Sequence, residues 1–344
     1  MDLQTRYLGL TLRSPLVASA GPLTGSLGGI TRLAEAGVGA VVLPSLFEEQ
    51  VWAEAERDRL LAEGGAESHS EAQSYFRNCT GPGRGDWPHR YLALIKRAVA
   101  EVDIPVIASL NGVSLGGWTC YASAMQAAGA AAIELNIYYL PGDVLIPARD
   151  AERRYTKILS AVKAVVSIPV AVKLSPYFSS FGEMATVLDQ AGAGGLVLFN
   201  RFLQTDIDPE TFTVSAGFRL SVPAEAALSR AWISRLHGLV SCSLAASSGV
   251  DSAADVAAYL LGGADVVMTT SSLLRHGPVH ARVLLDGLKD WMDRKGFKSL
   301  SAVRGLLAKA PEGDHAYSRS GYLSAIEQAT HAYGGPGAHQ GALA

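Results

Sequence analysis

One short pattern occurs four times along the chain, and it constrains the fold more than any other feature. Each copy places a glycine after a helix-like segment and then runs into small and apolar residues, and the copies occupy residues 35–43, 127–135, 190–198 and 261–268. Glycine commonly ends a helix because it adopts a left-handed backbone without penalty. The apolar run is typical of a strand buried on both faces of a parallel sheet. The pattern therefore predicts repeated helix–turn–strand units.

Strands of a second kind alternate with these copies. The eight predicted strands lie near residues 15–20, 40–45, 104–110, 131–136, 168–174, 195–200, 238–245 and 265–270. Residues 90–102, 152–166 and 254–261 have apolar side chains at helical spacing, and we expect Asp251 to cap the last of these helices. Eight such units predict a closed (β/α)8 barrel of the α/β class. An open doubly wound sheet is the alternative, but no G-x-G-x-x-G motif opens a helix after the first strand.

We expect one domain, residues 1–310, followed by a partly flexible extension, residues 311–344, that is rich in glycine from Tyr333 on. Two long connections, residues 46–89 and 201–222, would leave the carboxyl ends of the second and sixth strands. Barrels place their active sites at that end of the strands. Connections of this length in a compact domain are usually functional or disordered.

Composition excludes several classes of protein. The net charge of −3 offers no basic surface for nucleic acid, and no apolar run approaches the roughly 20 residues of a membrane span. The N-terminal segment resembles neither a signal peptide nor an amphipathic anchor. Cys79, Cys120 and Cys242 are too far apart in sequence to suggest a metal site and fit a reducing compartment. We therefore expect a cytoplasmic protein with no bound metal and no membrane or nucleic-acid partner.

Polar side chains stand where the predicted strands end. Lys173 closes an apolar strand, where it either faces a bound electron-rich group or extends to solvent. The chain has only four asparagines: Asn111, Asn136 and Asn200 follow the third, fourth and sixth strands, and Asn78 lies in the loop after the second. Each could simply shape a turn. Gathered at one rim, they suit a flat heterocycle with alternating carbonyl and N–H groups, because an amide both donates and accepts.

Small and hydroxyl residues follow the last two strands. Ser248 and Gly249 come after the seventh strand, and Thr270 and Ser271 end the eighth. They either cap the next helices or present donors to a phosphate, as these loops do in many barrels. A phosphate there, a ring beside Lys173 and a second heterocycle among the asparagines together predict FMN and a substrate. A lysine at the N1–C2 edge would stabilise reduced flavin.

Over residues 5–300 the chain resembles the dihydroorotate dehydrogenases, specifically the soluble class 1 branch. The likeness rests on Val172-Lys173-Leu174-Ser175-Pro176-Tyr177, on Asn136 and Asn200, and more loosely on Asn78-Cys79-Thr80-Gly81. The resemblance implies an FMN-binding barrel in which Asn78, Asn136 and Asn200 hold the substrate. The cofactor-binding positions that it implies are Ala18, Ser19, Ala20, Gly21, Ser45, Asn111, Asn136, Lys173, Asn200, Ser248, Gly249, Thr270 and Ser271.

Two positions depart from the family pattern. Tyr139 stands where the family has the Cys or Ser that removes the substrate proton, and Leu43-Pro44-Ser45 replaces a Thr-Lys-Ser sequence. The resemblance implies an FMN-dependent oxidoreductase acting on a CH–CH group of a dihydropyrimidine-like substrate. Tyr139 and Lys173 would be catalytic. The protein would be a homodimer, and the resemblance also allows an electron-transfer partner subunit. The alternatives are a non-redox barrel that binds a phosphorylated ligand, or a flavin electron-transfer subunit that does not turn over dihydroorotate.

Overall fold

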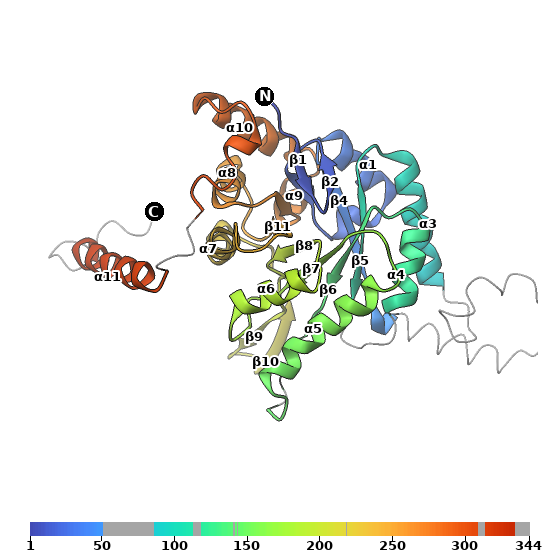
Figure 1. The fold of residues 1–344 in the computed structure, drawn as a ribbon, viewed down its shortest axis with the longest axis horizontal. Helices are drawn as coiled ribbons and strands as arrows, with labels where there is room; N and C mark the ends of the chain where they lie inside the picture. Colours follow the sequence, from blue (N-terminus) through green and yellow to red (C-terminus); the bar gives the residue numbers. More distant parts are fainter. Residues whose placement is uncertain are drawn as a thin grey trace, which may run out of the picture. The chain divides into compact units, whose positions relative to one another are not determined.

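Eight parallel strands close into a barrel in the computed structural model, which describes residues 1–50, 86–112, 118–139, 142, 144–217, 219–308 and 314–333. The barrel strands are β3 (Leu16–Ala18), β4 (Ala40–Phe47), β5 (Val106–Asn111), β6 (Ala132–Asn136), β7 (Val170–Leu174), β8 (Gly195–Leu198), β11 (Ser243–Ala246) and β12 (Val266–Thr269). Each pairs with the next along the chain, and β12 pairs with β3 to close the ring (Figure 1). The predicted α/β barrel is confirmed, and the open-sheet alternative is wrong.

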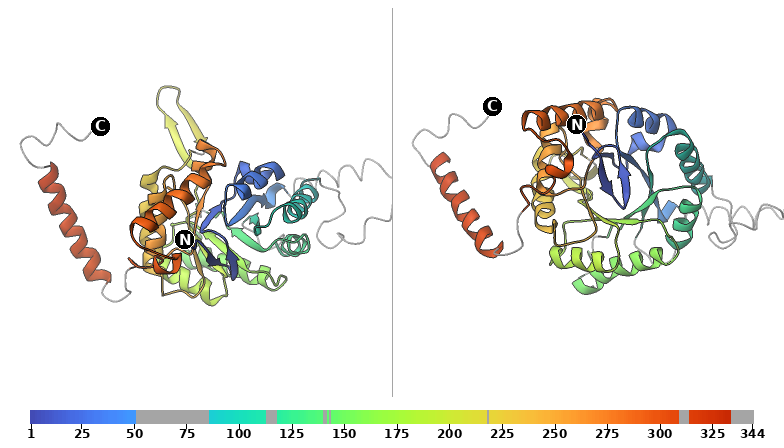
Figure 2. Two further views of the ribbon diagram at one scale, coloured as in Figure 1. Left: turned by 90° about the horizontal axis from the view of Figure 1, so that it is seen from above. Right: turned by 45° about the horizontal axis from the view of Figure 1, so that its top comes forward.

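Helices surround the strands as an outer layer (Figure 2, right). They are α1 (Leu27–Glu35), α3 (Asp86–Glu101), α4 (Trp118–Ala127), α5 (Ala148–Lys163), α6 (Phe181–Gln190), α7 (Ala226–Leu236), α8 (Ala253–Gly262), α9 (Ser271–His276) and α10 (His280–Arg294). Ser252 caps α8 by accepting a hydrogen bond from the Asp255 N–H, so the predicted capping role of Asp251 is wrong. Asp251 instead pairs with Arg275 at 2.7 Å. No helix of the described residues is both long enough and apolar enough to cross a membrane.

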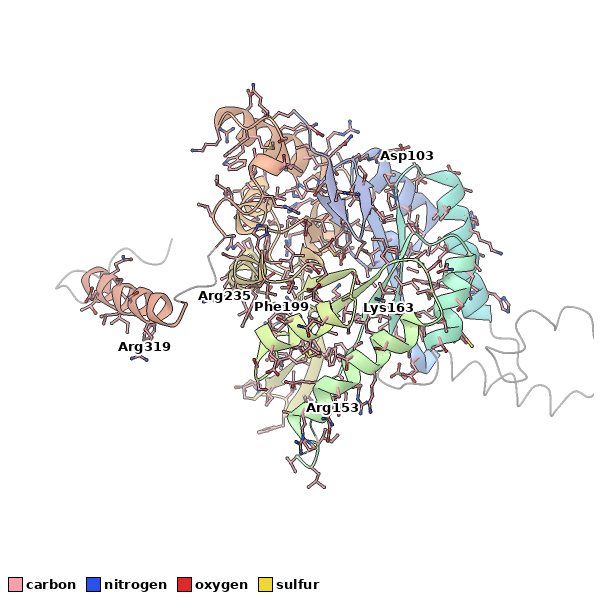
Figure 3. The ribbon with its side chains drawn as sticks, viewed as in Figure 1. Asp103, Arg153, Lys163, Phe199, Arg235 and Arg319 are labelled. Carbon is pink, nitrogen blue, oxygen red and sulfur yellow. The ribbon has the colours of Figure 1, made fainter. Side chains whose placement is uncertain are left out.

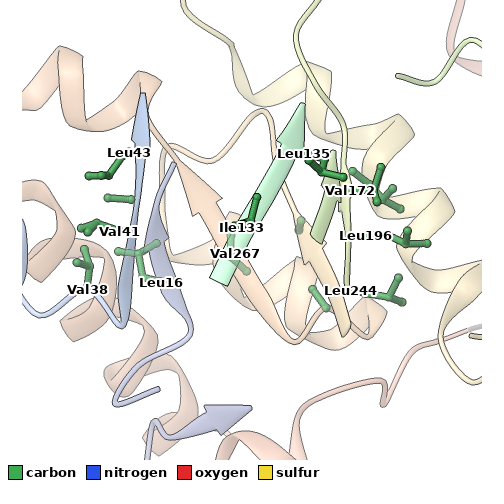
Figure 4. Close-up of a cluster of buried hydrophobic side chains, with 14 of the residues drawn as sticks. Leu16, Val38, Val41, Leu43, Ile133, Leu135, Val172, Leu196, Leu244 and Val267 are labelled. Carbon is green, nitrogen blue, oxygen red and sulfur yellow. The ribbon is translucent and has the colours of Figure 1, made fainter. Parts of the chain in front are cut away.

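Alternating side chains divide the core into two layers. One set of strand residues points outward and packs under the helices, as Leu43, Ile133 and Val172 do (Figure 4). The other set fills the barrel interior and comprises Val17, Ala40, Val42, Ile107, Ala132, Ala171, Val197, Ala245, Val266 and Met268. Because successive residues of a strand face opposite sides, a residue two positions from an interior residue also points inward.

A hairpin that sequence reasoning missed covers the amino-terminal end of the barrel. It consists of β1 (Thr5–Tyr7) and β2 (Leu10–Leu12), and Tyr7, Leu8 and Leu12 belong to the interior cluster. The Leu8 N–H donates to Ser243 Oγ at 3.1 Å, at the start of β11. A side chain at Gly195 would meet Leu8 at 2.8 Å, which explains the glycine that opens β8. We call the opposite, carboxyl-terminal end of the barrel the mouth.

The long connection after β8 contains a second hairpin, which projects from the barrel (Figure 2, left). Its strands are β9 (Gln204–Asp208) and β10 (Thr213–Gly217), paired antiparallel with Ile207 opposite Val214. The connection after β4 falls almost entirely outside the described residues, and Asn78 with it.

The chain separates into two compact units, Met1–Ala308 and Lys309–Ala344. The first contains the barrel and ends near a 3-10 turn, Leu300–Ala302. The second contains α11 (Asp314–Tyr333), a helix that we did not predict. Its described side chains, from residue 319 to residue 330, are exposed.

Candidate active site

Strand register brings three of the predicted polar residues to the same level of the barrel. Asn111 lies opposite Asn136 across β5 and β6, and Asn136 lies opposite Lys173 across β6 and β7. Each is an even number of residues from an interior side chain of its own strand: Ile107, Ala132 and Ala171. They therefore point into the carboxyl-terminal mouth, as the sequence predicted for parallel strand ends.

Lys173 is buried rather than extended to solvent, with 7% of its surface exposed. Its Nζ donates to Ser19 Oγ at 3.3 Å and lies 3.5 Å from Glu134 Oε1. Ser19 follows β3, on the opposite side of the barrel from β7 in strand order. The ammonium group thus lies inside the mouth, where a ligand would meet it.

Two of the asparagines bind each other. Asn200 Nδ2 donates to Asn136 Oδ1 at 2.7 Å, and the Asn200 N–H donates to the Leu174 carbonyl at 2.7 Å. Phe199 follows directly after β8 (Figure 3) and is buried. Its ring centroid lies 4.9 Å from that of Phe181 on α6. Each amide keeps unused hydrogen-bonding atoms, which can hold a second planar group.

Asn111 is the unpaired member of the set. It is 6% exposed, and its amide makes no hydrogen bond with any residue in the described part of the chain. Its amide is therefore available to a ligand at the carboxyl-terminal end of β5. Asn78, the fourth predicted asparagine, lies outside the described residues.

The segment after β3 and the end of β12 pack closely together. Thr270 Oγ1 donates to the Ser19 carbonyl at 2.9 Å, so the hydroxyl does not cap α9. A side chain at Gly21 would lie 2.5 Å from the Thr270 methyl group, which requires glycine there. Ala18 is buried at the end of β3, and Ala20 packs against the interior cluster. This contact shapes the mouth between the first and last barrel strands.

The loop after β11 has two consecutive residues with left-handed backbone. Ser248 has φ 82° and Gly249 has φ 65°. A side chain at Gly249 would lie 2.6 Å from the Ala226 nitrogen, so only glycine fits. The Tyr259 hydroxyl donates to the Ser248 carbonyl at 2.8 Å, and the Ser271 hydroxyl accepts from the Ser221 N–H at 3.0 Å. A non-glycine residue with positive φ is uncommon and, once seen, is reason to suspect function.

Strand β4 is irregular around Pro44. The pairing of β4 with β5 shifts between Val42 and Ser45, around Pro44, which has no N–H for the ladder. Ser45 Oγ lies 2.8 Å from Ser109 Oγ, and the Ser109 N–H donates to the Tyr91 hydroxyl at 2.9 Å. Ser45 is therefore held toward β5.

The two tyrosines after β6 point to opposite sides. Tyr139 packs against the outer core, with the Arg154 guanidinium of α5 4.2 Å from its ring centroid. Tyr138 stacks on Phe202 with centroids 4.3 Å apart, and its hydroxyl accepts the Leu203 N–H at 2.7 Å. Neither contact was predicted from the sequence.

Buried titratable groups surround the barrel. Burial raises the pKa of Tyr155 to about 12, and the Tyr155 hydroxyl donates to the Ile137 carbonyl at 3.3 Å, next to Asn136. Burial, then the charge of Glu134, raise the pKa of Tyr7 well above its ordinary value. Among the described residues, no group of three or more His, Cys, Asp or Glu side chains could hold a metal.

Comparison with known proteins places this geometry in a family. A sequence model described as "Dihydroorotate dehydrogenase" matches residues 81–292. The "Putative dihydroorotate dehydrogenase A (fumarate)" of Aeropyrum pernix is 30% identical over 223 residues, which is 63% of this chain and 72% of the relative. The "Dihydroorotate dehydrogenase B (NAD(+)), catalytic subunit" of Methanocella arvoryzae is 27% identical over 304 residues, 87% of this chain and 95% of the relative. The chain therefore belongs to the dihydroorotate dehydrogenase family.

Proposed function

We propose that this protein is an FMN-dependent oxidoreductase that acts on a CH–CH group of a small dihydropyrimidine-like molecule. Membership of the dihydroorotate dehydrogenase family supports the reaction class. The observation that carries the proposal is the buried Lys173 ammonium, which faces the mouth beside Ser19 and next in register to Asn136. Such a cation suits a ring that gains negative charge on reduction.

The residues present fit FMN. The unpaired amide of buried Asn111 and the Lys173 ammonium offer donors to a polar ring. The left-handed Ser248-Gly249 turn, together with Thr270 and Ser271, offers hydroxyl and backbone donors of the kind that bind phosphate. We assign Ala18, Ser19, Ala20, Gly21, Ser45, Asn136 and Asn200 to the remaining cofactor contacts. When bound, FMN would supply the acceptor for a hydride from a substrate carbon.

Asn136 and Asn200 would orient the substrate. Their mutual hydrogen bond leaves donor and acceptor atoms that can match alternating N–H and C=O groups. Asn78 is assigned to the same task from the resemblance. Tight orientation of the reacting carbon contributes a large part of the rate in such reactions.

We assign proton transfer to the loop after β6. Tyr139 stands at the family's base position and is our candidate for moving the substrate proton. The Arg154 guanidinium lies over its ring, 4.2 Å from the centroid. To reach a substrate in the mouth, the Tyr139 side chain must leave its place against the outer core, so turnover would require movement of this loop.

A second candidate function is a flavin electron-transfer subunit that turns over no dihydroorotate. The packing of Tyr139 under Arg154, away from the mouth, favours it. We also propose a cytoplasmic homodimer, with an electron-transfer partner subunit in the second case. The relative from Methanocella arvoryzae is itself named a catalytic subunit.

Spectroscopy tests both candidates. Purified protein should be yellow, with about one FMN per chain, and anaerobic dihydroorotate or another dihydropyrimidine should bleach the flavin. Colourless protein that does not take up FMN would refute the flavin proposal and leave the non-redox barrel. Bound flavin that is bleached only by a partner reductase would favour the second candidate.

A further inference from the structure

A carboxylate lies inside the barrel directly against Lys173. Glu134 is on β6, two residues before Asn136, and is 1% exposed. Its Oε1 lies 3.5 Å from Lys173 Nζ. Its Oε2 is buried and has no hydrogen-bond partner. Glu134 therefore lies one layer below Asn136, with its carboxylate against the Lys173 ammonium of the polar rim.

Stability does not explain this pair. Replacing a buried ion pair by apolar residues of similar volume is often neutral or stabilising. A buried carboxylate with one oxygen unpaired destabilises the folded protein further, because no hydrogen bond offsets the cost of removing that oxygen from water. The neighbouring interior positions Ala132 and Ala171 show that this barrel fills its centre with apolar side chains elsewhere. A charge kept in such a place points to function.

The surroundings leave the charges of the pair weakly screened. Ser19 Oγ, from the segment after β3, contacts Lys173, and buried Ser109 of β5 lies opposite Glu134 in the strand register. The charge of Glu134 also acts on the hydroxyls of Tyr7 and Tyr91. Tyr7 is 1% exposed, its hydroxyl has no hydrogen-bond partner, and burial, followed by the charge of Glu134, raises its pKa. The β1–β2 hairpin closes the amino-terminal side against water. A charge in this interior acts over a longer distance than one at the surface.

We propose that Glu134 is a positioning residue that sets how much positive charge Lys173 offers to the flavin, and thereby sets the flavin reduction potential. The inference rests on the proposed function, because it requires FMN in the mouth. Hydride transfer brings two electrons and one proton, and so adds one negative charge to the ring system. Lys173 favours that added charge and Glu134 opposes it. The pair together holds the potential below the value that the lysine alone would produce.

Four proteins test the proposal: the wild type, Glu134→Gln, Lys173→Met and the double variant. Glu183→Gln is the matched control, since Glu183 is an exposed glutamate on α6. FMN content is measured first, and the potential of the bound flavin is then measured by equilibration with a reference dye. Affinity for sulfite, an anion that adds at flavin N5, is a second readout that does not depend on turnover.

We expect opposite shifts from the two single variants. Glu134→Gln should raise the reduced-to-oxidised ratio at fixed potential at least tenfold, which is about 30 mV for a two-electron couple, and should tighten sulfite binding. Lys173→Met should shift both in the other direction. The double variant has lost both charges and should lie between the single variants, near the wild type, while Glu183→Gln should match the wild type.

The results distinguish failure of the proposed function from failure of this inference alone. A wild type that binds no FMN refutes the proposed function and this inference with it. Normal FMN content with an unchanged or lowered potential in Glu134→Gln refutes the inference alone. If Glu134→Gln does not fold, the double variant is compared with Lys173→Met. Loss of the Glu134 charge must raise the potential there too, and failure to do so refutes the proposal.

Discussion

Replacing Tyr7 by phenylalanine should stabilise this barrel. Tyr7 is 1% exposed in the interior cluster, and its hydroxyl has no hydrogen-bond partner. A buried polar group without a partner costs about 1–3 kcal/mol. Phenylalanine keeps the ring and removes that cost, so we expect the free energy of unfolding to rise by about 1 kcal/mol at neutral pH.

The gain should grow in alkaline solution. Burial, and then Glu134, raise the pKa of Tyr7 in the folded protein above its ordinary value of 10.0. Below pH 10 the Tyr7 hydroxyl is neutral in both the folded and the unfolded protein, so the free energy of unfolding does not depend on its ionisation. Above pH 10 the unfolded tyrosine ionises first, and the free energy of unfolding of the wild type therefore falls as pH rises. Each pH unit in that range should cost the wild type about 1.4 kcal/mol that Tyr7→Phe does not lose.

Urea denaturation of both proteins at pH 7 and pH 11, followed by far-UV circular dichroism, measures these differences. Tyr259→Phe is the matched control, because the Tyr259 hydroxyl donates to the Ser248 carbonyl at 2.8 Å. That variant should lose about 1 kcal/mol at neutral pH. The reasoning fails if Tyr7→Phe destabilises the protein at neutral pH, since the hydroxyl would then have a partner that contributes to stability.

Three further predictions concern the mouth. Gly249→Ala places a side chain 2.6 Å from the Ala226 nitrogen at φ 65°, a conformation that costs about 1–2 kcal/mol. Flavin fluorescence titration should show at least about tenfold weaker FMN binding. Unchanged affinity would argue against this turn as the phosphate site. Asn136→Ala and Asn200→Ala should each raise KM about tenfold. Because the amides share a 2.7 Å hydrogen bond, the double variant should lose less than the product; full additivity in steady-state kinetics would contradict a shared role. Tyr139→Phe should lower kcat at least about a hundredfold with FMN content unchanged, whereas unaltered kcat, with loss of activity in Tyr138→Phe instead, would transfer the proton step to Tyr138.

The barrel itself was predictable because its signals are local. Glycine turns such as Gly192 and Gly263 end helices with positive φ, and the apolar strands follow them within a few residues. Parallel strands share one carboxyl end, so the positions of Lys173 and Asn136 along their strands sufficed to place both at one mouth. Strand boundaries were less accurate where turn and strand resemble each other. Residues 238–242 precede β11 instead of opening it.

What the amino-acid sequence determined alone was the barrel and the level at which its polar rim stands. Only the tertiary structure decided which groups meet there, because those contacts join distant parts of the chain. Lys173 reaches Ser19 across 154 residues and Glu134 across 39. The β1–β2 hairpin closes the far end through contacts with β8 and β11, and Tyr138 and Tyr139 separate according to whether Phe202 or Arg154 lies opposite. The local pattern of apolar residues does not reveal these partners, because they become neighbours only when the strands close into the barrel.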